Sequence, residues 1–220
     1  MSYLLAYNLL ITAITIALAL VSVYNLRRFA RLPFAKGLTD ALHKPLVSIL
    51  VPARNEERCI EACVRSLCEQ DHDNVEVIVL DDGSTDATGA ILAQLSVDYP
   101  HLRVIKGAPL PQGWVGKSWA CQQLSKQARG ETLIFTDADT THRPDMVRRA
   151  HAYITQNNVS LFSCVPYQVL GSVGEHIVIP MIHVLYFAYL PNDLILNNKR
   201  VSLSAANGQF MCFTREAYDR

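Results

Sequence analysis

The sequence lacks an excess of charge of either sign, because 20 Lys and Arg side chains balance 20 Asp and Glu side chains in 220 residues. A nucleic-acid partner needs clustered basic side chains for its phosphates, so we expect none here. The GxGxxG fingerprint of dinucleotide-binding folds and the GxSxG turn of serine hydrolases are also missing. These absences count against three large classes of function.

The cysteines lack the spacing of metal ligands. They form no CxxC pair and lie near no histidine at zinc-finger spacing, which argues against a structural zinc site. We expect reduced thiols that serve as small apolar residues, three of them within one helix. The six are Cys59, Cys63, Cys68, Cys121, Cys164 and Cys212.

Charged side chains are absent from residues 1–26. Residues 3–24 are mostly Leu, Ile, Ala and Val, and a helix needs about 20 such residues to cross a bilayer. No basic residue precedes this run and no convincing cleavage site follows it, which favours a retained transmembrane helix over a signal peptide. A buried core helix is the other alternative, but a helix that is apolar on every face has little to pack against in so small a domain.

Basic residues follow the apolar run. Arg27, Arg28, Arg31 and Lys36 all precede the first acidic residue, Asp40. The positive-inside rule then places the N-terminus outside and the rest of the chain in the cytoplasm, held at the cell membrane by a single-pass anchor. We therefore divide the chain into a transmembrane anchor at 1–26, a basic juxtamembrane linker at 27–45 and a domain at 46–220.

Short apolar runs rich in β-branched residues alternate with helical stretches after residue 45. The runs predict strands at 46–51, 75–80, 102–105, 132–136 and 160–165, with a further strand at 207–213. Helices are predicted at 56–69, from Ser84 or Thr85 as the cap to about 95, at 117–128 and at 144–157. This alternation predicts an α/β fold with a mostly parallel sheet and helices on both faces.

Polar side chains gather where the predicted strands end. In open parallel sheets, ligands bind beyond the carboxyl ends of the strands. Arg54, Asn55, Glu56 and Glu57 follow the first predicted strand, Asp81 and Asp82 follow the second, and Asp137 and Asp139 follow the fourth. We therefore expect one edge of the sheet to collect acidic side chains from three loops.

Asp137 and Asp139 have the spacing of a divalent-cation site. Carboxylates at positions i and i+2 beyond a strand can point to the same side and share Mg²⁺ or Mn²⁺, which suits a diphosphate ligand. The alternative is an ordinary loop, because Asp-x-Asp is common in turns and helix caps. The position beyond an apolar strand favours the cation site.

Two further groups near the same edge could contact a ligand. Asp81 and Asp82 precede Gly83, which permits close backbone approach, so they could hydrogen-bond a base or ribose; a plain strand-to-helix turn is the alternative. Lys117 follows Gly116 at a predicted helix N-terminus, where an ammonium and the helix dipole act on the same anion. A solvated surface lysine is the alternative for Lys117.

The pattern changes after the fifth predicted strand. Residues 177–190 carry no formal charge, are interrupted by Pro180 and are too short to span a bilayer. We favour a helix in or near the membrane interface over a core helix. The sequence stops in what resembles the start of a helix at 215–219, so we expect a fragment of a longer protein.

In order, these motifs resemble glycosyltransferase family 2, whose members share the nucleotide-sugar-binding fold called GT-A. The matching residues are 51–57 (VPARNEE), 81–86 (DDGSTD), Gly116 with Lys117, and Asp137 with Asp139. The similarity covers about 45–220. The stretches 109–120 and 208–211 are most similar to bacterial membrane-anchored members linked to hopanoid and carotenoid-type lipids.

The resemblance implies transfer of a sugar from a nucleotide-diphosphate donor, with a UDP-sugar expected first, to a hydroxyl of a lipid or lipid-linked acceptor, assisted by Mg²⁺ or Mn²⁺. Donor binding is assigned by position to Pro52, Ala53, Arg54, Glu56, Asp81, Asp82, Lys117, Asp137 and Asp139. Asp137 and Asp139 would also hold the metal, with Asp139 as the direct ligand. The family usually supplies its catalytic base from an acidic motif after the 208–211 segment, so we assign no base and expect it beyond Arg220.

Two other functions fit parts of the pattern. A chain without the catalytic base could be a non-catalytic donor-binding module, and an acidic motif in a longer reading frame would exclude that function. A sugar-phosphate nucleotidyltransferase would share a nucleotide fold and a metal. It would need a glycine-rich, Arg-containing loop after the first strand, whereas residues 52–56 contain no glycine.

Overall fold

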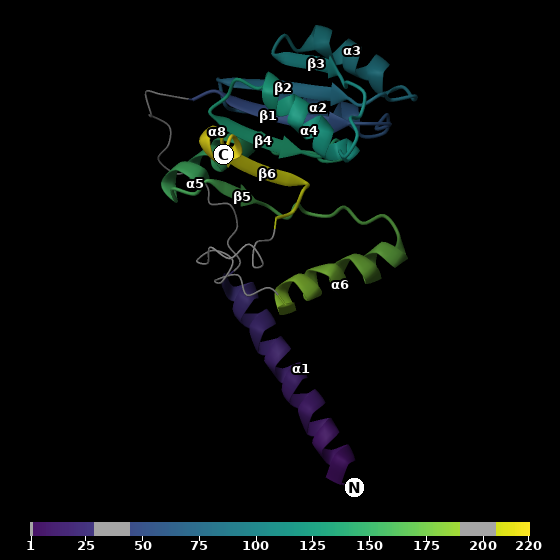
Figure 1. Cartoon of the computed structure of the whole chain (residues 1–220), viewed down its shortest axis with the longest axis vertical. Helices are drawn as coiled ribbons and strands as arrows, with labels where there is room; N and C mark the ends of the chain where they lie inside the picture. Colours follow the sequence, from purple (N-terminus) through teal and green to yellow (C-terminus); the bar gives the residue numbers. More distant parts are fainter. Residues whose placement is uncertain (1, 29–44, 190–205) are drawn as a thin grey trace. The chain divides into compact units, whose positions relative to one another are not determined.

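The computed structural model describes residues 2–28, 45–189 and 206–220 (Figure 1). Residues 29–44, most of the linker expected at 27–45, and residue 190 at the end of the expected interface helix lie outside the described residues. The chain divides into two compact units. We call residues 1–31 with 167–205 the helical unit, and residues 32–166 with 206–220 the sheet unit.

The sheet unit is built on six strands in the order β3-β2-β1-β4-β6-β5 (Figure 1). The strands are β1 (Val47–Ala53), β2 (Val75–Asp81), β3 (Leu102–Lys106), β4 (Thr132–Thr136), β5 (Leu161–Ser163) and β6 (Phe210–Thr214). β1 pairs in parallel with β2 and β4, and β2 pairs in parallel with β3, whereas β6 is antiparallel to both of its neighbours. The expected α/β fold with a mostly parallel sheet is confirmed.

Helices cover both faces of this sheet because successive strand residues point to opposite sides. On β2, Val77 and Val79 face the core shared with α2 (Ile60–Cys68), α3 (Thr88–Asp98) and α5 (Met146–Gln156). Ile78 and Leu80 face the other core, which α4 (Gly116–Gln127) completes. The short helix α8 (Arg215–Tyr218) follows β6.

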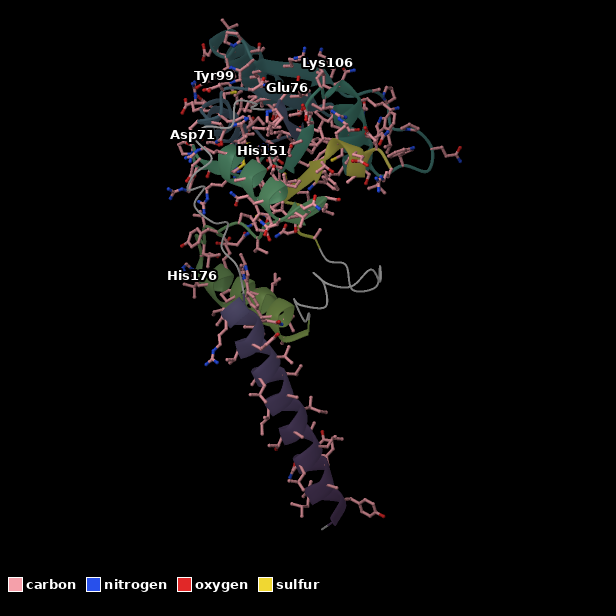
Figure 2. The ribbon with its side chains drawn as sticks, turned by 90° about the vertical axis from the view of Figure 1, so that its left-hand side faces the viewer. Asp71, Glu76, Tyr99, Lys106, His151 and His176 are labelled. Atoms are coloured by element: carbon pink, nitrogen blue, oxygen red, sulfur yellow. The ribbon has the colours of Figure 1, made fainter. Side chains whose placement is uncertain are left out.

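The amino-terminal ends of the central strands are fixed by a buried carboxylate. Glu76, labelled in Figure 2, has a side chain only 4% exposed and accepts hydrogen bonds from the Ser48 hydroxyl at 2.6 Å and the Arg129 amide at 2.6 Å. Ser48 Oγ in turn accepts from the amide of Gly130 at 2.8 Å. A Cβ at Gly130 would lie 2.6 Å from Ser48 N, so this crossing requires glycine.

The carboxyl ends of β1 and β2 lie level with one another. Ala53 is the register partner of Asp81, and the amide of Asp82 donates to the carbonyl of Ala53 at 2.9 Å. The loops that leave these two strands therefore start side by side. This register places the polar segments of the sequence at one edge of the sheet, next to the end of β4.

The helical unit contains α1 (Ser2–Arg28) and α6 (Val173–Tyr189). By length and composition, the run Tyr3–Arg27 is the single candidate for a membrane-crossing helix in the part of the chain that the structure describes. Asn25 is fully buried and its side-chain amide donates to the carbonyl of Phe187 at 2.7 Å. This bond joins the last turns of α1 to the last turns of α6.

Candidate functional site

A cavity of about 300 Å³ opens at the carboxyl edge of the sheet. Its lining residues come from the end of β1, from the loops after β1, β2 and β4, and from the first turns of α4. They are Pro52, Ala53, Arg54, Glu56, Asp82, Gly116, Lys117, Ala120, Asp137, Ala138 and Asp139. Eight of the nine side chains that the sequence singles out are among them. Asp81 is not in this lining.

The loops after β1 and β2 are tied together by reciprocal hydrogen bonds. Asn55 has a φ of 56°. Its backbone amide donates to Ser84 Oγ at 3.0 Å, and its side-chain Oδ1 accepts from the backbone amide of Thr85 at 2.8 Å. The amide of Glu56 donates to Thr88 Oγ1 at 2.8 Å. Because asparagine tolerates the left-handed region better than most residues, it suits this position. These bonds hold Arg54 and Glu56 at the cavity.

The prediction that Ser84 or Thr85 caps α3 is wrong, because both residues bond to Asn55 instead. Ala87 is the cap residue and makes no side-chain cap bond. The hydroxyl of Ser84 is instead engaged by Asn55, while Asp86 accepts from the amide of Thr88 at 3.0 Å. A long-range partner therefore takes the side chain that a local pattern would assign to the helix end.

The two carboxylates after β2 have different roles in the structure. Asp81 Oδ1 accepts from the amide of Ser84 at 2.9 Å, so Asp81 shapes the turn that contains Gly83 at a φ of 70°. Asp82 lines the cavity, where its Oδ2 lies 3.9 Å from Arg54 Nη1. A Cβ at Gly107 would lie 3.0 Å from Asp82 Oδ1, so the absence of a side chain at Gly107 leaves space for this carboxylate.

Lys117 crosses the cavity to Asp137. It lies in the first turn of α4, which begins at Gly116, and its Nζ is 2.6 Å from Asp137 Oδ1. Asp139 is exposed, and among the described residues no side chain forms a hydrogen bond or an ion pair with it. The structure therefore brings together one engaged and one available carboxylate at the expected metal-ligating pair.

The cavity carries more negative than positive charge. Four carboxylates, those of Glu56, Asp82, Asp137 and Asp139, face two basic groups. Burial, followed by the charges of Asp139 and Asp137, raises the pKa of Glu56. The mutual repulsion of these carboxylates favours a cationic ligand at the site.

The carboxylates suit a hard divalent cation that is shared with a ligand. Among the described residues no group of three or more His, Cys, Asp or Glu side chains is arranged to hold a metal. Mg²⁺ does not require such a cage, since it is commonly bound through one or two carboxylates together with substrate phosphates. Asp137 and Asp139 fit that mode of binding.

A buried network that the sequence did not reveal supports Asp137 from behind. Thr140 Oγ1 donates to the carbonyl of Asp137 at 2.7 Å, and Thr136 Oγ1 donates to the carbonyl of Gln209 at 3.0 Å. His142 Nε2 lies 2.9 Å from Thr140 Oγ1 and 3.1 Å from Thr136 Oγ1. With both hydroxyls donating to carbonyls, a proton on Nε2 would satisfy the contacts of the ring with both threonines. Burial lowers the pKa of His142 to about 4.

A second, more apolar cavity of about 430 Å³ lies next to the first. The two share Pro52, Lys117 and Asp137 as lining residues. The second is completed by aromatic and sulfur-containing side chains that include Trp114, Cys121, Phe135, Met211, Phe213 and Tyr218. The ion pair between Lys117 and Asp137 therefore stands at the boundary between a polar and an apolar space.

Comparison with known families and sequences gives a consistent result. The profile of the family described as glycosyl transferase family 2 matches residues 48–220. A beta-monoglucosyldiacylglycerol synthase from Synechocystis sp. is 37% identical over 123 residues, which are 55% of this chain and 25% of that protein. A 4,4'-diaponeurosporenoate glycosyltransferase from Staphylococcus haemolyticus is 32% identical over 133 residues, which are 60% of this chain and 34% of that protein.

Solved structures show the same fold. The mannosyltransferase PcManGT of Pyrobaculum calidifontis, solved with GDP-Man and Mn²⁺, superposes with a TM-score of 0.63 at 24% identity over 94% of this chain and 55% of that one. The glucosyl-3-phosphoglycerate synthase of Mycobacterium tuberculosis, solved with UDP, gives a TM-score of 0.51 at 23% identity over 78% of this chain and 57% of that one. The expected GT-A fold is confirmed. The chain spans a quarter to a third of the length of the two curated relatives.

Proposed function

The chain belongs to glycosyl transferase family 2, and we propose that its sheet unit binds a nucleotide-diphosphate sugar for transfer to a lipid acceptor. The observation that carries this proposal is the convergence of loops from β1, β2 and β4 on one polar cavity at the carboxyl edge of a parallel sheet. That edge is where open α/β sheets bind their ligands.

The basic groups of the cavity fit the donor's diphosphate. Lys117 lies in the first turn of α4, where amide dipoles and the ammonium act on the same anion. Arg54 enters from the loop after β1 and its side chain is 66% exposed, so it is available to a ligand. The neighbouring Asp82 offers acceptor oxygens for the hydroxyl groups of a ribose.

Asp137 and Asp139 would hold Mg²⁺ or Mn²⁺ in this function. The cation would supply Lewis-acid stabilisation of the charge that develops on the leaving diphosphate. Asp139 is the expected direct ligand because no side chain in the described ranges engages it. The network of Thr136, Thr140 and His142 would keep the turn that carries both carboxylates in place.

The acceptor is proposed from the relatives and from the helical unit. The two curated relatives are named for transfer to a diacylglycerol lipid and to a carotenoid acid. We propose that α1 anchors this chain in the cell membrane with the sheet unit in the cytoplasm, as Arg27 at its end indicates. α6 would lie in the interface, since its side chains at Ile177, Val178 and Met181 are 58% to 63% exposed.

A substitution within α1 tests the anchor. Ile11→Arg together with Ile14→Arg places two charges near the middle of the run, at a cost of about 3 kcal/mol each for membrane insertion. The variant should leave the membrane pellet after an alkaline carbonate wash, whereas Val97→Arg, on the exposed surface of α3, should stay. Retention of the α1 variant in the pellet would refute the anchor.

The transfer itself is tested with membranes that contain the chain. Radiolabelled UDP-glucose, and GDP-mannose in parallel, are supplied with Mn²⁺, and label is followed into the chloroform-extractable fraction. The proposal expects label from one donor to enter the lipids, and Asp139→Asn to abolish this transfer. Asp98→Asn is the matched control, because Asp98 is an exposed carboxylate on α3 that pairs with Arg65. Donor binding is measured on the same membranes, because binding and transfer can fail separately; membranes that neither bind nor transfer either sugar nucleotide would contradict the proposal.

A further inference from the structure

The loop between β3 and α4 is unusual in carrying no charge. Residues 107–116 read GAPLPQGWVG, with Lys106 before them and Lys117 after them. Two prolines and Gly113, which has a φ of 85°, set the path of the backbone. Exposed loops of soluble domains are normally polar, so an uncharged run of this length calls for an explanation.

The exposed apolar surface of the sheet unit is concentrated in this loop. The large apolar side chains that are exposed among its described residues are Val97, Leu110, Trp114, Val115 and Leu161. Three of these five lie in one six-residue stretch of the loop, 110–115. The exposed fractions are 55% for Leu110, 42% for Trp114 and 72% for Val115. Single exposed apolar residues are common, but a cluster marks a contact surface.

The loop is held in place by α4. The amide of Ala108 donates to Gln123 Oε1 at 2.7 Å, and Trp119 Nε1 donates to the carbonyl of Ala108 at 3.1 Å. The rings of Trp114 and Trp119 meet with their centroids 5.2 Å apart. The apolar tip is thus presented on a fixed base, which lowers the entropy lost when it binds a surface.

The loop also borders both cavities. Gly116, where the loop meets α4, lines the polar cavity together with Lys117, and Trp114 lines the apolar cavity. Any surface that contacts this loop therefore lies next to the candidate donor site. Lys106, labelled in Figure 2, is an exposed ammonium at the other end of the loop.

We propose that residues 107–116 contact the membrane, with Leu110, Trp114 and Val115 entering the headgroup region of the bilayer. Tryptophan is enriched at that depth and a flanking lysine suits anionic headgroups. Three side chains are too few for a specific protein interface, which buries about 800 Å² on each partner, whereas shallow insertion into lipid needs no matched surface. The inference rests on the proposed lipid acceptor, because it explains how the site reaches a substrate in the membrane.

Intrinsic fluorescence tests this contact because the chain has only two tryptophans, Trp114 and Trp119, and none in α1. The full chain is reconstituted in nanodiscs of phosphatidylcholine and phosphatidylglycerol, with or without bromine on the acyl chains near the headgroup. Brominated lipid should quench the wild-type emission, by roughly half if the two rings emit equally, and should quench Trp114→Phe much less. This variant keeps the Trp119 bond that anchors the loop.

Charge substitutions provide the matched comparison. Leu110→Asp should reduce the quenching, whereas Val97→Asp, an exposed apolar position on α3, should leave it unchanged. Equal quenching of the wild type and Trp114→Phe would overturn the inference. If brominated lipid does not quench the emission but acrylamide cannot reach the rings either, a second copy or another protein covers the loop. That result would also overturn the inference. UDP binding is measured on the same nanodiscs: binding without quenching refutes the loop contact alone, whereas quenching without binding refutes the donor site alone.

Discussion

Among single residues, Lys117 and Asp137 form an ion pair in the polar cavity that a bound diphosphate and cation would have to separate. The Lys117 ammonium occupies Oδ1 of a carboxylate that is also assigned to a divalent cation. In the proposed function, an incoming diphosphate would offer Lys117 a second anionic partner and so would free Asp137 for the cation. Donor and metal would then bind together more readily than either does alone.

Lys117→Met should separate these two roles. Mn²⁺ alone should bind the variant a few-fold more tightly than the wild type, because an exposed ion pair worth about 1 kcal/mol or less no longer competes. UDP should bind about tenfold more weakly, because a charge-assisted contact is lost. Free Mn²⁺ is followed by electron paramagnetic resonance and UDP by calorimetry. Lys126→Met, in the last turn of the same helix, is the control, and an unchanged Mn²⁺ affinity would refute the competition.

His142 makes stability depend on pH. Its pKa is about 4 in the folded protein, against 6.5 for an unperturbed histidine, so the neutral ring stabilises the fold fully above pH 6.5 and this contribution is lost as pH falls toward 4. The loss amounts to at most about 3 kcal/mol. His142→Gln should flatten the pH dependence of the unfolding free energy in this window, measured by urea denaturation. His101→Gln, at an exposed site, should keep the wild-type slope; an equal slope in His142→Gln would contradict the assignment.

The sequence predicts most of the residues that line the polar cavity, but not the residues that support them. Strand ends in a parallel sheet meet at one edge, so the position of Asp137 and Asp139 beside Lys117 follows from the order of elements. The choice between Asp81 and Asp82 depends on the turn geometry at Gly83, which the sequence leaves open. Thr136, Thr140 and His142 form no recognisable motif, because their connection arises only when the turn after β4 folds back on itself.

At the scale of elements, Glu76 joins β2 to β1 and to the segment that leads into β4. Burial raises its pKa, but hydrogen bonds from the Ser48 hydroxyl and from the amide and guanidinium of Arg129 outweigh burial and leave the pKa of Glu76 lowered. Removing a buried carboxylate that accepts several hydrogen bonds leaves the donors of those bonds unpaired. The strand ends therefore depend on one side chain.

Glu76→Ala should lower the unfolding free energy by about 3 to 5 kcal/mol, because Ser48 and Arg129 lose a buried partner. Glu76→Gln keeps an acceptor oxygen and should cost about half as much. Guanidinium unfolding followed by near-ultraviolet circular dichroism measures both. Glu61→Ala, which removes an exposed ion pair with Arg65, should change stability by less than about 1 kcal/mol. A Glu76→Ala effect as small as that of Glu61→Ala would show that the network is dispensable.

Elements were more predictable than their ends. The apolar runs at 75–80, 102–105 and 132–136 correspond closely to β2, β3 and β4, because buried parallel strands are continuous in apolar residues. The helix expected at 56–69 begins only at Ile60 as α2. The backbone amides of residues 55–57 donate instead to side chains in the segment 84–88, and a local sequence pattern does not predict such long-range partners.

At the scale of the whole molecule, alternation of strands and helices predicts the fold class, whereas the order of strands is a property of the folded chain. β6 is antiparallel to β4 and β5, and it enters the sheet between them although it is last in sequence. Nothing in the residues 207–213 distinguishes this position from an edge. The division into anchor, linker and domain stays a prediction.

We propose above all that the cavity at the ends of β1, β2 and β4 and the start of α4 binds a nucleoside diphosphate with a divalent cation. Calorimetric titration of the detergent-solubilised chain with UDP, and then with GDP, each with and without Mn²⁺, tests it most directly. We expect one nucleotide to bind in a Mn²⁺-dependent manner, and we expect Asp139→Asn to remove this dependence while the circular dichroism spectrum stays unchanged. A folded chain that binds neither nucleotide, or an Asp139→Asn variant that binds like the wild type, would contradict it.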